Sequence, residues 1–136
     1  MRIRSHKCVL FVLVTLSALS FGLTGCSNNS LSPFQPEIGN ASDNFQFQAT
    51  AIENTSTMVT YSWNNSSTMA KVNQSSAITR GNAVVVLSDA NRTEVYRRTL
   101  GVNGDSTSSA GVAGVWTVTV TLTNLSGTLN FRAEKK

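Results

Sequence analysis

The chain has 136 residues, one His and two Cys, and its eleven Lys and Arg against seven Asp and Glu give a formal net charge of +4. Three of the cations, Arg2, Arg4 and Lys7, stand at the start of the chain, so from Cys26 onward the formal charge is only +1. That remainder lacks the strongly basic surface typical of nucleic-acid-binding proteins, and no nucleic-acid partner is expected.

The first 26 residues have the pattern of an export signal. The positive residues are followed by an apolar segment from Cys8 to Leu23, which is shorter than the about 20 residues that a helix needs to cross a bilayer. The segment ends in Leu23-Thr24-Gly25-Cys26, and polar Ser and Asn residues follow at once. This tetrapeptide resembles the lipobox of bacterial lipoproteins, in which small residues separate an apolar residue from an obligatory Cys.

The resemblance implies that residues 1–25 are a signal peptide, that cleavage occurs before Cys26, and that Cys26 carries a diacylglycerol on sulfur and an acyl chain such as palmitate on nitrogen. A thiolate is the side-chain nucleophile suited to that alkylation. Two or three chains anchor a protein stably, since each buried methylene contributes about 0.8 kcal/mol. The expected location is the extracytoplasmic side of the bacterial cell envelope, with the membrane as a partner. Ser27 favours the outer membrane where one exists. An uncleaved anchor and an ordinary secretory signal are the alternatives.

Cleavage at this point would also limit the chemistry of the domain. His6 and Cys8 would be removed and Cys26 acylated, which excludes Ser-His-Asp or Cys-His catalysis, Cys and His zinc sites, and disulfides. The acids are too scattered in sequence to indicate a catalytic pair, and one Asp in a Gly-rich loop is too few ligands for calcium. We therefore predict no catalytic residue, no metal and no cofactor, and we do not expect an enzyme. The acids are Glu37, Asp43, Glu53, Asp89, Glu94, Asp105 and Glu134.

Residues 26–43, "CSNNSLSPFQPEIGNASD", are rich in Ser, Asn, Pro and Gly and poor in apolar residues. Such a composition buries too little surface to offset its ordering entropy. The segment is predicted to be a flexible tether that holds a domain, residues 44–136, away from the bilayer. The isolated apolar residues Leu31, Phe34 and Ile38 are expected to make only transient contacts.

Short β-type patterns begin at Asn44. Alternation places Phe45, Phe47, Ala49 and Ala51 on one face of a first strand. A second strand, "TMVTYSW", has Val59, Tyr61 and Trp63 on one face, and "TMAKVNQ" is a weaker strand with Ala70 and Val72 inward.

The unbroken apolar run from Ala83 to Leu87 predicts a central strand, joined by a turn at residues 89–92 to "EVYRRTL" in a hairpin. Asn91 is expected at positive φ in this turn. Residues 101–114 are predicted to be irregular and to cross between sheets. In "VWTVTVTLTN" the apolar residues point inward and the threonines outward. A turn at residues 124–127 then predicts a C-terminal hairpin with "TLNFRAEK". The inward residues of these last two strands are Trp116, Val118, Val120, Leu122, Leu129, Phe131 and Ala133.

About seven short strands separated by polar turns predict an all-β fold, an antiparallel two-sheet β-sandwich. The pattern resembles immunoglobulin-like and jelly-roll modules of bacterial surface proteins, although the immunoglobulin Cys pair is missing. Architecture of this kind does not define an activity.

The function expected from the sequence is that of a non-catalytic binding or structural module of the cell envelope, with an envelope protein or a glycan as partner. One alternative is a carbohydrate-binding module that stacks sugars on Trp63 and Tyr61, whereas Trp116 is expected in the core. Another is an inhibitor or accessory subunit that docks through a strand edge. The oligomeric state is left open.

Overall fold

The computed structural model describes residues 34–136, so the signal segment and Cys26 lie outside the described residues. Every regular element in the described range is a β-strand, and every strand pair is antiparallel. The all-β, antiparallel class and the number of strands are thus confirmed. The strands are β1 (Glu37–Ala41), β2 (Asn44–Asn65), β3 (Ala70–Gln74), β4 (Ala77–Ser88), β5 (Glu94–Thr99), β6 (Gly104–Thr107) and β7 (Gly114–Lys135).

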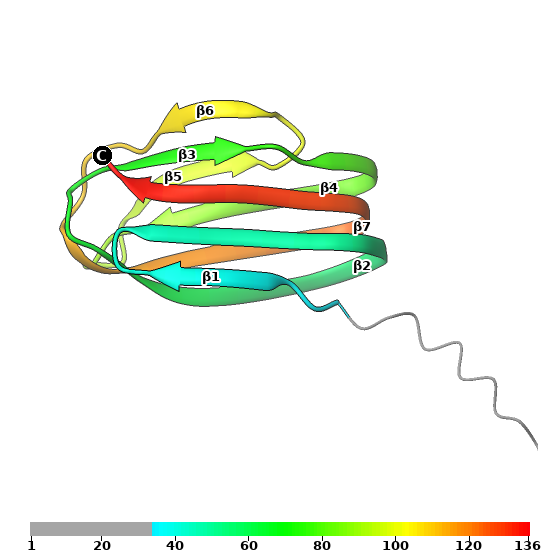
Figure 1. Ribbon diagram of the computed structural model, residues 1–136, viewed down its shortest axis with the longest axis horizontal. Helices are drawn as coiled ribbons and strands as arrows, with labels where there is room; N and C mark the ends of the chain where they lie inside the picture. The colour runs from blue at the N-terminus through cyan, green and yellow to red at the C-terminus, as the bar shows by residue number, and fades with distance from the viewer. Residues whose placement is uncertain (1–33) are drawn as a thin grey trace, which may run out of the picture.

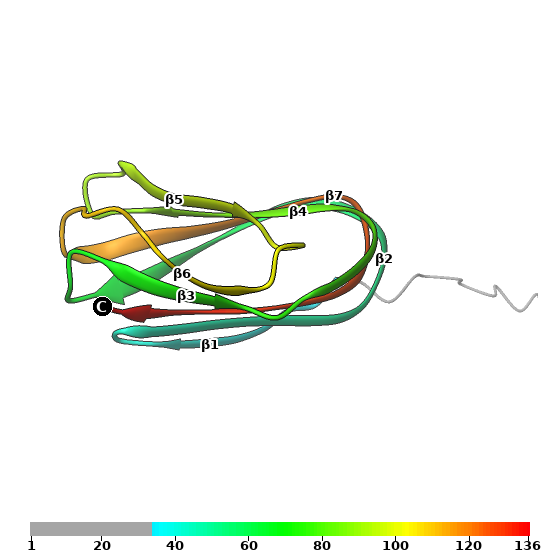
Figure 2. The same ribbon diagram turned by 90° about the horizontal axis from the view of Figure 1, so that it is seen from above.

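Hydrogen bonding joins all these strands into one sheet. Its path is β1-β2-β7-β3-β6, while β4 pairs with β7 and β5 pairs with β4. The long strands β2 and β7, of 22 residues each, bend midway, so that their halves lie in two layers facing each other (Figures 1 and 2). We call the layer with β1, β3 and β6 the lower layer and the layer with β4 and β5 the upper layer. The expectation of two separate sheets is not confirmed, because the bent strands keep the sheet continuous.

Irregular backbone at one end of the molecule makes the bends possible. The register of β2 on β7 shifts between Ala49 and Thr57, and that of β4 on β7 shifts between Ile78 and Asn82. Such bulges bend a strand and increase its twist. The positive φ values required there occur at Ala51, Asn54, Gly81, Asn124 and Gly127.

The predicted C-terminal hairpin is wrong for the same reason. Asn124 and Gly127 have the positive φ of turn residues, 44° and 137°, yet β7 runs on through them. They form a bulge because β2 accompanies β7 on both sides of the bend, from Asn44 opposite Glu134 to Asn65 opposite Gly114. The two strands predicted for residues 44–63 are likewise the two halves of β2.

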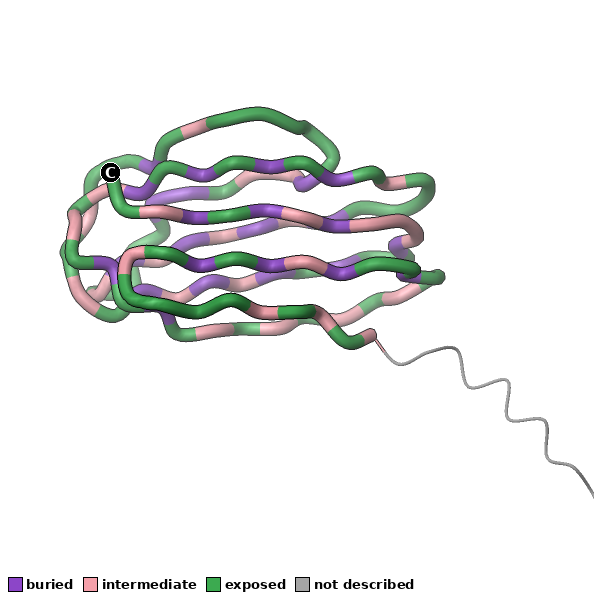
Figure 3. The backbone as a smooth tube through the Cα atoms, in the orientation of Figure 1, coloured by how far each residue is buried: buried purple, intermediate pink, exposed green. Residues whose placement is uncertain are grey.

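The core lies between the layers, and buried and exposed residues alternate along the strands (Figure 3). All seven inward residues predicted for β7 are at most 2% exposed. Ala51 is an exception to the predicted faces: it is exposed, and Ile52 is buried in its place. The bulge after Ala49 shifts the alternation by one residue.

The predicted tether ends earlier than residue 43. β1 pairs with β2 from Glu37 opposite Gln48 to Ala41 opposite Asn44. Ile38 lies opposite Phe47, and the Phe34 ring lies 6.4 Å from that of Phe47. Because β2 offers them an apolar surface, Phe34 and Ile38 pack against the core instead of making only transient contacts. Residues 26–33 of the predicted tether lie outside the described residues.

The hairpin of β4 and β5 is confirmed, and β4 is central because β5 and β7 flank it. Arg92 takes the positive φ, 64°, that was expected at Asn91. The segment predicted to be irregular contains β6, which pairs with β3 in the lower layer although β5 before it lies in the upper layer (Figure 2). The predicted crossing between layers is therefore present, with a short strand inside it.

Candidate functional site

Trp63 is in the core, which removes it as a ligand contact. It lies opposite Trp116 in the register of β2 on β7, and the two rings pack edge to face with centroids 5.9 Å apart. Trp63 is 1% exposed and Trp116 is fully buried, so neither ring offers a face to a sugar. Polar residues follow Trp63, but β2 does not end there and continues to Asn65, which is itself fully buried.

Tyr61 is half-buried on the same face of β2. Its ring centroid lies 5.6 Å from that of Phe45 and 6.2 Å from that of Phe47, both in the lower layer, so Tyr61 packs between the layers at the side where β2 is the outermost strand. Burial raises the pKa of its hydroxyl. With Trp63 buried, Tyr61 does not form the predicted two-ring platform.

The outer face of the lower layer carries a charged cluster that the sequence did not reveal. Lys71 of β3 lies 3.4 Å from Asp105 of β6, and Arg132 lies 3.1 Å from Glu134 on β7. With Asn73 these residues line a hollow of about 270 Å³. The side chain of Asn73 and the charge of Lys71 lower the pKa of Asp105. Exposed pairs of this kind stabilise a fold by only about 0–1 kcal/mol.

This cluster pairs two cations with two carboxylates, an arrangement that does not activate any of them for catalysis. Each carboxylate faces a cation instead of a second carboxylate, whereas acid-base catalysis relies on groups whose pKa values are pushed apart. Its residues come from three strands that are distant in sequence, so only the strand order brings them together.

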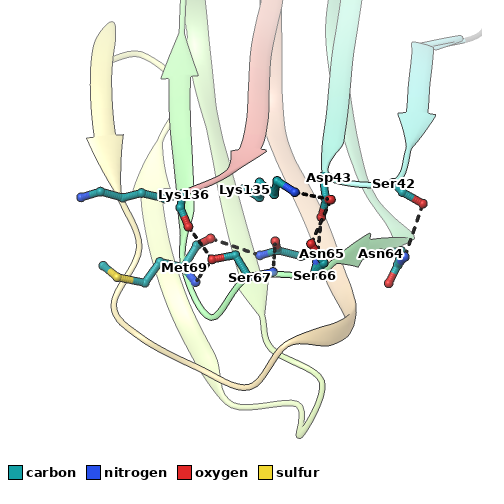
Figure 4. A network of polar contacts seen from close by, with 9 residues as sticks. All are labelled: Ser42, Asp43, Asn64, Asn65, Ser66, Ser67, Met69, Lys135 and Lys136. Atoms are coloured by element: carbon teal, nitrogen blue, oxygen red, sulfur yellow. Dashed lines mark hydrogen bonds and ion pairs between the residues drawn. The ribbon is translucent and has the colours of Figure 1, made fainter.

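A polar network closes the end of the molecule opposite the bends (Figure 4). Asp43, in the turn between β1 and β2, accepts hydrogen bonds from Ser66 N at 2.7 Å and Ser66 Oγ at 2.9 Å, and its carboxylate lies 3.0 Å from Lys135 Nζ. The bond from the backbone of Ser66 and then that from Lys135 lower the pKa of Asp43. Ser67 Oγ donates to the carbonyl of Lys136. The last two residues, Lys135 and Lys136, are therefore held in the fold.

Asp89 caps backbone groups of the turn between β4 and β5. It is 3% exposed and accepts hydrogen bonds from the N–H groups of Asn91 (3.0 Å), Thr93 (2.8 Å) and Val112 (2.9 Å). Burial alone would raise the pKa of Asp89, but these three bonds outweigh it and lower the pKa. Glu94 pairs with Arg97 on its own strand at 2.7 Å.

Two amides hold the crossing segment in place. The amide of Gln74, 2% exposed, accepts from Tyr96 Oη at 2.8 Å and donates to the carbonyls of Val102 at 2.8 Å and Thr99 at 3.1 Å. Asn103 accepts from Ser76 N at 2.7 Å and donates to the Ser76 carbonyl at 3.0 Å. These side chains satisfy backbone groups between the layers, which is a structural role.

Within residues 34–136, no group of three or more His, Cys, Asp or Glu side chains is placed to hold a metal ion. The same range has no helix long and apolar enough to cross a membrane. No protein family, no curated protein and no solved structure matches the chain.

Proposed function

We propose that the protein is a lipid-anchored lipoprotein of the bacterial cell envelope, most consistent with the outer membrane where there is one, and that its domain is a non-catalytic binding or structural module. The observation that carries the proposal is Cys26 at the end of Leu23-Thr24-Gly25-Cys26, directly after a short apolar segment. Eight Cα–Cα steps separate Cys26 from Phe34, a span of at most about 29 Å. The domain would thus stay close to the membrane surface.

The geometry of the described residues supports a non-catalytic role. Asp43, Asp89, Glu94, Asp105 and Glu134 each contact a cation or cap backbone groups. Asp105 and Glu134 line the same hollow, but each of them pairs with a cation there. We infer that the folded sheet serves as an immunoglobulin-like or jelly-roll sandwich, a scaffold that presents edges and loops to partners. The two layers and their shared core support this inference.

Docking through a strand edge is the second candidate function. The described residues support it better than they support glycan binding. Sugar stacking needs an open aromatic face, which Trp63 lacks. By contrast, the half of β2 in the upper layer pairs with β7 alone, which leaves one side of its backbone open.

Acylation at Cys26 can be tested by mass spectrometry of the protein purified from bacterial membranes. We expect an N-terminus at Cys26 and a mass increment from a diacylglycerol and an acyl chain. Cys26→Ser should abolish the increment and leave the signal segment uncleaved, while the control Cys8→Ser should keep the modification, because Cys8 lies within the removed segment. A wild-type protein that begins at Met1 with an unmodified Cys26 would overturn the proposal.

A further inference from the structure

The outermost strands of the two layers differ in how well they are protected against pairing with another chain. β1 and β6 have only five and four residues, and β5 carries Glu94, Arg97 and Arg98. Short edges and charged edges both discourage pairing. β2 is different: from Thr57 to Asn65 it runs in unbroken register with β7 and has neither a charge nor a proline. We call residues 57–65 of β2 the open edge.

Hydrogen bonds at one end of the open edge show which backbone groups face outward. The carbonyl of Ser62 accepts from Asn40 Nδ2 at 2.8 Å, and the carbonyl of Asn64 accepts from Asp43 N at 2.8 Å. Neither donor belongs to β7. Because every second residue of an antiparallel strand faces the same neighbour, Met58 and Thr60 also direct their N–H and C=O groups away from β7. No strand of the described chain pairs with that side.

Three side chains at or next to these free groups are apolar or aromatic. Met58, 68% exposed, is the most exposed large hydrophobic side chain of the described residues. Val59 and Tyr61 face the core but are only partly buried. A strand added here would bury all three side chains and satisfy the backbone groups of Met58 and Thr60.

We propose that the open edge pairs with the open edge of a second copy of this chain, antiparallel, about a two-fold axis at Val59. This register sets Met58 opposite Thr60 of the second copy, so every free N–H of these residues meets a free C=O. The Val59 side chains then lie directly opposite each other, with Cβ atoms roughly 4.5–5.5 Å apart. Because the open edge carries no charge, two copies can approach there without charge repulsion, and the closed two-fold contact leaves only the short or charged edges of β1, β5 and β6 unpaired.

The two-fold pairing is also compatible with anchoring of both copies in one bilayer. Its axis runs perpendicular to the upper layer, so the two copies turn the same face of the domain toward the membrane. The reach of at most about 29 Å from Phe34 to Cys26 then applies equally to both copies. The pairing itself depends on β2 alone and not on acylation.

Disulfide crosslinking of the full chain tests the register. Val59→Cys places two thiols across the axis, near the Cβ separation of about 3.5–4.5 Å that a disulfide needs. Under mild oxidation we expect a product of twice the monomer mass with a bond from residue 59 to residue 59. The control Val102→Cys should not give this product, because Val102 is exposed but lies between β5 and β6, neither of which pairs with β2. No product, equal crosslinking of the control, or a bond from residue 59 to another polypeptide would overturn the proposal.

Thr60→Pro tests the backbone pairing. The substitution removes a backbone N–H that points away from β7 and makes no hydrogen bond to another strand of the described chain. Proline is tolerated at such edge positions. In detergent, the wild-type full chain should sediment as a dimer and T60P as a monomer with an unchanged circular dichroism spectrum. If T60P does not fold, Met58→Lys should weaken the dimer about tenfold through the charge it adds on the outer face. A dimer unaffected by the folded variant, or a monomeric wild type, contradicts the pairing. Acylation is read separately from the mass of the Cys26 peptide, so the two proposals can fail independently.

Discussion

Trp63 and Trp116 occupy facing positions of β2 and β7, yet their indole N–H groups differ in partner. Trp116 Nε1 donates to the carbonyl of Val112 at 2.8 Å. Trp63 Nε1 is buried and has no acceptor among the described residues. A buried donor without a partner costs free energy relative to one that is bonded. Both rings are therefore buried to a similar extent, but only the Trp116 ring adds a hydrogen bond to the stability of the fold.

Phenylalanine substitutions should separate these terms. Both Trp63→Phe and Trp116→Phe lose buried ring area, but only W116F loses a hydrogen bond. We expect W116F to lower the free energy of unfolding by about 1 kcal/mol more than W63F does. Urea denaturation followed by circular dichroism measures the difference, and W63F is the matched control. Equal losses would show that Trp63 also has a polar partner.

At the scale of elements, alternation predicted which residues of each strand face inward but not how the strands continue. The faces of residues 116–122 and 129–133 follow from the period of two, because one side of each strand is buried. The sequence at residues 124–127 predicts a turn, whereas the structure has a bulge there. Turns and bulges both use positive φ, and only the strand alongside decides between them.

Gly127 is the position where the bend of β7 depends most directly on a missing side chain. Its φ is 137°, and a Cβ there would collide with the carbonyl oxygen of Ala77 on β4. Gly127→Ala should therefore destabilise the fold by about 1–3 kcal/mol through strain and overpacking. The control Gly39→Ala places its Cβ 3.4 Å from that of Gln46, an ordinary contact. Thermal unfolding should show a clear drop for G127A alone, and similar midpoints for both variants would argue against a tight bend.

The candidate surfaces could be predicted less well than the strand faces. Alternation predicts that Tyr61 and Trp63 share one face, which the structure confirms, but their exposure depends on what the opposite layer covers. The charged cluster around Lys71 and the open edge of β2 depend on strand order, which a pattern of period two does not contain. Local pattern determines the direction of a side chain, and pairing between distant segments determines its surroundings.

At the scale of the whole molecule, polar contacts fasten segments that the core does not reach. β1 is held by pairing with β2, and Asn40 Nδ2 donates to Ser62 O, from the lower to the upper layer. At the same end Asp43 ties the first turn to Ser66 and to Lys135 near the C-terminus. Residues 34–136 contain no Cys and hence no disulfide that could join these segments. Ionised carboxylates such as that of Asp43 therefore help to hold the ends of the fold together.

This dependence on carboxylates predicts how stability varies with pH. The fold lowers the pKa values of Asp43, Asp89, Glu94 and Asp105, so the unfolded chain binds protons more readily than the folded chain. Their contribution to stability is complete above the unfolded values and is lost as the pH falls from about 5 through the folded values. The thermal midpoint should be flat near neutral pH and drop steeply in acid. Asp89→Asn should lower the midpoint at neutral pH and flatten the acid drop, so that its curve meets that of the wild type at low pH. A wild-type midpoint that stays constant down to about pH 3 would contradict the assignment of these carboxylates.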